Sequence, residues 1–199
     1  GTKIYKNKIL GLRGKATGLV FSIFLRQRHV RTKEWAKQFV QRPGEPKKHE
    51  IFMWFSAAVD TSYSQKSPDT IAFSYLGITN KGKCIVLDEK VYSNAELDIP
   101  LAPSDTVKNL IDFLDRNKKE WGLARNVFLD SADQATMQEW NKYKRRNGCI
   151  YTLNDAWKKM EIIDRINAQL GWMAFDDQTG IEPCFYVLDT CSTYIHEME

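Results

Sequence analysis

The sequence lacks the features that mark membrane, secreted and zinc-binding proteins. No apolar run in its 199 residues is long enough to span a bilayer, and the N-terminus shows no signal-peptide pattern. The four cysteines form no C-x-x-C pair, which argues against structural zinc. Because Cys84, Cys149 and Cys184 sit in apolar, strand-like runs, we expect reduced core thiols in a soluble cytosolic protein.

A glycine-rich phosphate loop is also missing. No G-x-x-x-x-G-K-[ST] pattern occurs, so we expect no ATPase site in this chain. Internal repeats and low-complexity tracts are absent as well, while 43% hydrophobic and 12% aromatic residues indicate a globular protein. A chain of this length fits one domain with a proper core.

Positive charge is in slight excess and is concentrated near the N-terminus. The net charge of +4 suits a polyanionic partner, although many domains with no nucleic-acid role carry as much. We interpret residues 1–50 as a basic arm or lead-in that belongs to the same domain as a core over 51–199. The arm either lies along a phosphate backbone or is a solvated linker, and its cations are Arg26, Arg28, Arg31, Lys33, Lys37, Arg42, Lys47 and Lys48.

The order of predicted elements indicates a mixed sheet with helices packed on it. Three successive strands are expected over 51–60, 71–78 and 84–92, followed by alternating helices and strands, including a strand over 126–130. This order is typical of an α/β fold. The patterns also predict a strand over 19–24, a helix over 154–171 that Gly171 ends with Ile163 on its buried face, and a strand over 172–175.

Two strands end in a lone carboxylate. Asp60 closes the run IFMWFSAAVD and Asp130 closes NVFLD. The carboxyl ends of neighbouring parallel strands form the ligand crevice of an open α/β sheet, where two such acids repel unless a divalent cation lies between them. The pair is therefore a candidate Mg²⁺ or Mn²⁺ site suited to phosphoryl transfer. The alternative interpretation makes Asp130 a helix N-cap and Asp60 a turn residue.

The chain resembles the C-terminal nuclease domain of the large terminase subunit of tailed bacteriophages. The likeness rests on several short motifs whose order and spacing agree, and it covers essentially all 199 residues: YKNKILGLRGKATGLVFSIF, AAVDTSYSQKSPDTIAF, KCIVLDEKVY, VFLDSAD, NDAWKKMEIIDRI and TYIHEME. It implies a ribonuclease H-like fold, a mixed β-sheet flanked by α-helices.

The resemblance also implies roles for individual residues. Asp60 and Asp130 correspond to catalytic metal ligands, with Asp133 as a nearby substitute, and two Mg²⁺ or Mn²⁺ ions are implied for the complete site. Lys158 and Lys159 correspond to phosphate-contacting lysines, or are ordinary exposed helix lysines. Asp88 and Glu89 are read as solvated turn acids or as outer neighbours of the metal.

One part of the family pattern is not found. The third acid of the family lies in an Asp-His-x-x-Asp motif after the late helix, and we expect it beyond Glu199, which predicts a truncated core and weak metal binding by these 199 residues. His196 and Glu197 correspond to the preceding helix and are not assigned.

The expected function is metal-dependent cutting of concatemeric double-stranded DNA during phage packaging. The implied partners are DNA, an upstream ATPase domain of the same polypeptide, the portal protein and the small terminase subunit, without a membrane, in the host cytoplasm. Two alternatives stay open. One is a Holliday-junction resolvase or transposase of the same fold, and the other is a non-catalytic module that binds DNA or docks onto the motor.

Overall fold

A computed structural model describes residues 20–61, 63, 70–94, 96–130, 132–156 and 160–199. Among these, seven strands form one sheet in the order β1-β7-β4-β3-β2-β5-β6. The strands are β1 (Val30–Arg31), β2 (Phe52–Asp60), β3 (Ile71–Thr79), β4 (Cys84–Tyr92), β5 (Asn126–Leu129), β6 (Thr152–Asp155) and β7 (Phe185–Leu188). The helices are α2 (Arg26–His29), α3 (Lys33–Lys37), α4 (Pro103–Glu120), α5 (Gln134–Asn147), α6 (Ile162–Met173) and α7 (Ser192–Met198).

The strand directions are those of a ribonuclease H-like sheet. β2, β3 and β4 form an antiparallel meander, and β5 then pairs parallel with β2 and β6 parallel with β5. β7 runs parallel to β4, and β1 parallel to β7. β3 alone therefore opposes the other six strands, whose carboxyl ends share one edge. The predicted α/β fold, a mixed sheet flanked by helices, is confirmed.

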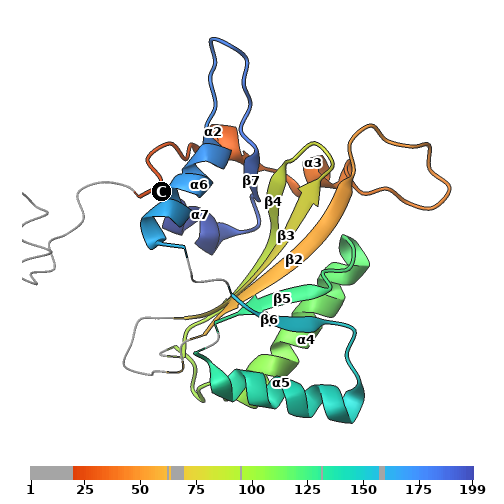
Figure 1. Cartoon of the computed structure of the whole chain (residues 1–199), viewed down its shortest axis with the longest axis vertical. Coiled ribbons are helices and arrows are strands. Elements are labelled where there is room, and N and C mark those ends of the chain that lie inside the picture. Colours follow the sequence, from red (N-terminus) through yellow and green to blue (C-terminus); the bar gives the residue numbers. More distant parts are fainter. Residues whose placement is uncertain (1–19, 62, 64–69, 95, 131, 157–159) are drawn as a thin grey trace, which may run out of the picture.

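Helices cover both faces of the sheet. Figure 1 shows α4 and α5 together on one side of β2, β5 and β6, and α6 and α7 on the other side of the molecule. The ring of Phe113 on α4 lies 5.7 Å from that of Phe73 on β3, which marks the face that α4 covers. Phe73 pairs with Val59, so Val59 shares this face and the next residue, Asp60, points to the opposite one. We call these the α4 face and the α7 face.

The end of α4 is fixed by a close approach of backbone to side chains. Gly122 follows the helix with a φ of +148° and leaves no room for a Cβ beside the ring of Phe55. The hydroxyl of Tyr75 donates to the carbonyl of Gly122 and accepts from the amide of Ala124 at 2.9 Å. Burial raises the pKa of Tyr75 to about 12, which keeps this donor protonated.

Several sequence expectations differ from the structure in the first and last parts of the chain. Residues 20–24 form a turn and not a strand. The helix expected over 154–171 is split, because β6 runs to Asp155 and α6 begins only at Ile162. Gly171 does not stop α6, which continues to Met173, and Ile163 is exposed. Cys184, expected in the core, is exposed, whereas Cys84 and Cys191 are buried.

No helix of the described residues is long and apolar enough to cross a bilayer.

Residues 30–31 of the predicted basic arm supply β1, which lies at the edge of the sheet against β7.

We predict that Gly122→Ala lowers the free energy of unfolding by about 3 kcal/mol, because the new Cβ meets Phe55 and the backbone conformation is strained. Urea unfolding followed by far-ultraviolet circular dichroism measures this change. Gly82→Ala is the control, since Gly82 has a φ of +82° with open space around its Cβ position. It should cost only about 1–2 kcal/mol. Equal losses in the two variants contradict the packing argument.

Candidate metal-binding and nuclease site

Asp60 and Asp130 come together at the carboxyl edge of the sheet. Val59 on β2 pairs in parallel register with Leu129 on β5, so the residue after each lies at the same level and on the same face. Asp60 is exposed and Asp130 is half-buried. Both line a pocket of about 590 Å³ that opens on the α7 face. The structure thus brings the two predicted acids to one cavity.

This cavity, which we call the carboxylate pocket, is closed on one side by the start of α6. Its lining is Val59, Asp60, Asp130, Ala156, Met160, Glu161, Ile162 and Arg165. Three carboxylates and one guanidinium therefore line the same pocket: Asp60 at the end of β2, Asp130 after β5, and Glu161 and Arg165 at the start of α6. Glu161 and Arg165 were not singled out by the sequence motifs. Their position becomes apparent only once α6 is seen to begin at Ile162.

Hard oxygen donors of this kind suit Mg²⁺ or Mn²⁺. Magnesium is held by one or two carboxylates and keeps several of its own waters, so Asp60 and Asp130 fit such an ion. The described part of the chain contains no group of three or more His, Cys, Asp or Glu side chains placed to hold a metal. A site made from these residues would therefore rely on the aspartate pair.

Asp133, predicted as a substitute metal ligand, is the N-cap residue of α5 in the structure. Its Oδ1 accepts the amide of Thr136 at 3.0 Å, which makes it the N-cap of α5, and its Oδ2 accepts the hydroxyl of Thr61 at 2.5 Å. Asp130 accepts the amide of Ala132 at 3.0 Å through Oδ1. The alternative interpretation made Asp130 the N-cap of the following helix, but the N-cap of α5 is Asp133. Metal ligation by Asp133 stays a prediction.

A tyrosine adds to this capping network. The hydroxyl of Tyr63 hydrogen-bonds Thr136 on α5. Burial raises the pKa of Tyr63, and the negative charge of Asp133 contributes to the same shift, so the hydroxyl remains protonated. Asp133 and Tyr63 together tie the chain after β2 to the start of α5.

We predict that Asp133→Ala destabilises the protein by about 1–2 kcal/mol through loss of the N-cap, whether or not metal is present. Thermal unfolding with EDTA and with Mn²⁺ tests this. A loss that appears only with Mn²⁺ would identify Asp133 as a metal ligand instead. Asp164→Ala, on the exposed first turn of α6, removes an aspartate that makes no side-chain hydrogen bond among the described residues and serves as control.

Lys158 and Lys159, the predicted DNA-contacting lysines, lie outside the described residues. The flanking residues Ala156 and Met160 line the carboxylate pocket. The predicted phosphate contact stays a prediction.

Two neighbouring acids on β4 hold helices on opposite faces of the sheet. Asp88 accepts hydrogen bonds from Arg116 at 2.6 Å and Asn117 at 2.7 Å, both on α4. Glu89 accepts the backbone amides of Thr193 at 2.7 Å and Tyr194 at 2.8 Å, at the start of α7. The expectation of solvated turn acids is therefore wrong for both. Since side chains alternate along a strand, their adjacency in β4 was the signal for this division.

Glu89 also lies beside Asp60. A second pocket, of about 250 Å³, is lined by Asp60, Glu89, Thr193, Tyr194 and Glu197 together with apolar residues of β2, β3 and β4. Asp60 is shared by this pocket and the carboxylate pocket. Burial raises the pKa of Tyr194 to about 12, so its hydroxyl carries no charge there.

We predict that Glu89→Ala loosens α7 while leaving the sheet intact, because charge-assisted bonds to two helix amides are lost. Hydrogen exchange should show the amides of Thr193 and Tyr194 exchanging about tenfold faster, equivalent to roughly 1.4 kcal/mol of local stability. Glu197→Ala removes a carboxylate from the same pocket without touching these amides. Equal acceleration in both variants argues against the cap.

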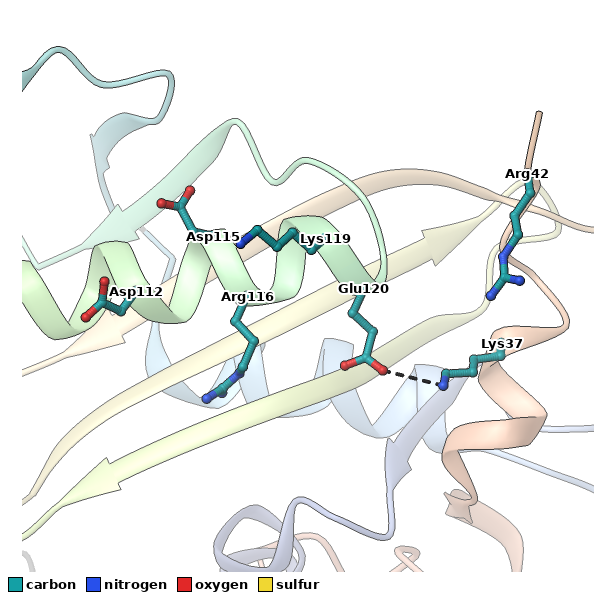
Figure 2. Close-up of a pocket in the computed structure, with 7 residues that line it drawn as sticks. All are labelled: Lys37, Arg42, Asp112, Asp115, Arg116, Lys119 and Glu120. Carbon is teal, nitrogen blue, oxygen red and sulfur yellow. Dashed lines mark ion pairs between the residues drawn. The ribbon is translucent and has the colours of Figure 1, made fainter.

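A larger cavity, of about 640 Å³, lies on the α4 face and does not include Asp60 or Asp130. Figure 2 shows Lys37 and Arg42 on one side of it and side chains of α4 on the other. Glu120 pairs with Lys33 and Lys37, and other lining residues are also engaged, Arg116 with Asp88 and Asp115 with Tyr151. The cavity is therefore lined by charges that largely neutralise one another.

Most of the cations listed for the basic arm form ion pairs with acids of the same chain. Arg26 pairs with Glu199, Arg28 with Asp177 and Glu182, and Lys48 with Glu45. With the pairs of Lys33 and Lys37 on Glu120, five of the eight predicted phosphate-binding cations hold acids of the same chain. Arg31 lies over the rings of Trp35 and Tyr186. These contacts reduce the positive charge that the segment presents to a polyanion.

Models of known protein families do not match the sequence, and neither do curated proteins. Solved structures do match. The large terminase of a thermophilic bacteriophage aligns with all of this chain at a TM-score of 0.62 and 16% identity. Its ADP and ATP-gamma-S complexes align at a TM-score of 0.61 and 17% identity. The chain spans 41% of the length of the first structure. At this identity the likeness establishes a shared fold.

Proposed function

We propose that this chain is the nuclease part of a phage DNA-packaging terminase and cuts concatemeric double-stranded DNA with Mg²⁺ or Mn²⁺. The observation that carries the proposal is the placement of Asp60 and Asp130 in one pocket by two neighbouring parallel strands. The fold likeness of this chain to part of a large terminase supports it. The upstream ATPase domain, the portal protein, the small terminase subunit and action in the host cytoplasm belong to the same proposal.

In this mechanism the residues of the chain position a cation in a pocket that stays open to water. Asp60 and Asp130 would hold the ion at the edge of the sheet, and a bound ion would supply Lewis-acid activation of water and stabilisation of the leaving oxygen. The register of β2 on β5 fixes the relative height of the two carboxylates. The pocket is open, so a phosphodiester can reach it from solvent while the rest of the duplex stays outside.

Asp60→Ala should reduce nicking of supercoiled plasmid in Mn²⁺ to below about 1% of the wild-type rate, because loss of a direct ligand exceeds the 10–100-fold cost of losing an outer partner. Asp112→Ala is the control, since Asp112 is an exposed aspartate of α4 that lines the cavity on the other face. It should cut as the wild type does. Nicking retained in Asp60→Ala overturns the assignment.

The same assay, run on the wild type, also separates the proposed function from its two alternatives. Inert proteins that bind DNA without metal would favour the docking-module alternative. A strong preference for branched DNA would favour the resolvase alternative.

A further inference from the structure

Among the residues that the structure describes, Arg165 is the one cationic side chain that lines the carboxylate pocket. It is an exposed residue of α6, whereas the two aspartates come from the ends of β2 and β5. The structure therefore brings together a guanidinium and the aspartate pair from three separate elements. The motif NDAWKKMEIIDRI contains this arginine, but the resemblance assigned no role to it.

A phosphate that enters this pocket meets predominantly negative charge. Asp60, Asp130 and Glu161 are carboxylates and a phosphodiester is also an anion. Without a cation, the pocket would therefore repel the phosphodiester. A guanidinium offsets that repulsion and presents a planar fork of donors that matches two phosphate oxygens. Arg165 has both properties and lies in the same cavity.

Two other arginines of the described residues, Arg26 and Arg28, are paired with acids of the chain. Arg26 holds Glu199 with two hydrogen bonds of 2.9 Å, and Arg28 is paired with Asp177. Within the described residues Arg165 forms no ion pair and no side-chain hydrogen bond, although three carboxylates share its pocket. Its fork is thus available for a ligand.

We propose that Arg165 binds the DNA phosphate next to Asp60 and Asp130. The inference rests on the proposed function and names the residue that gives the site affinity for its substrate backbone. A contact of this kind recognises phosphate and not base sequence, so it acts equally on all sequences. The competing explanation is that Arg165 only relieves repulsion among the three carboxylates.

The test is the salt dependence of DNA binding without divalent cations, measured by fluorescence anisotropy with a short labelled duplex over a series of KCl concentrations. Arg165→Gln should lower the slope of log affinity against log salt by about one, and weaken binding similarly for unrelated sequences. Arg165→Lys should keep the slope and lose part of the affinity, because the charge remains and the fork is gone.

Arg146→Gln is the matched control, because Arg146 lies in the last turn of α5, on the other side of the sheet. Its slope should equal that of the wild type. The proposal is overturned if Arg165→Gln binds DNA with unchanged slope and affinity. It is also overturned if that variant changes only Mn²⁺ affinity, which would show that Arg165 screens the acids.

The binding assay is independent of cutting. Plasmid nicking by the wild type tests the proposed nuclease function, whereas the salt slope tests the phosphate contact even if every form is inert in the nicking assay. Failure of one is therefore distinguishable from failure of the other.

Discussion

The parallel pairing of β2 with β5 is the constraint on which the candidate site depends. Ala57 and Val59 are buried between Tyr75, Phe73, Val127 and Leu129, so the register cannot slip by one residue without turning these side chains out of the core. The same constraint sends Asp60 to the opposite face, at the level of Asp130. Core packing on one face thus sets the geometry of the acids on the other.

The turn that joins α4 to β5 helps to place β5 beside β2. β5 begins four residues after Gly122, and the tight turn depends on the hydroxyl of Tyr75, which bridges the backbone of Gly122 and Ala124. Phe55 fills the space beside Gly122. Side chains of β2 and β3 therefore position the start of β5, together with its ladder to β2.

The sequence allowed the sheet and the aspartate pair to be predicted, because strong apolar strands ending in a single acid are a local signal. β2, β3, β4 and β5 lie close to their predicted ranges. The region after residue 150 was harder, since the apolar pattern of 154–171 is continuous across a strand and a later helix. Glu161 and Arg165 line the carboxylate pocket because α6 begins only at Ile162, after the break that follows β6. The alternation of side chains along β4 indicates that Asp88 and Glu89 lie on opposite faces, but their partners on α4 and α7 are tertiary contacts that no local pattern reports.

Asp88 and Glu89 give β4 a mechanical property. The side chain of Asp88 accepts hydrogen bonds from Arg116 and Asn117 on one face of the sheet, and the side chain of Glu89 accepts the amides of Thr193 and Tyr194 on the other. The two helical layers cannot shear past each other without breaking a charge-assisted bond at this strand. A displacement of α4 would consequently be passed on to α7, and with it to the second pocket beside Asp60, through these two side chains of β4.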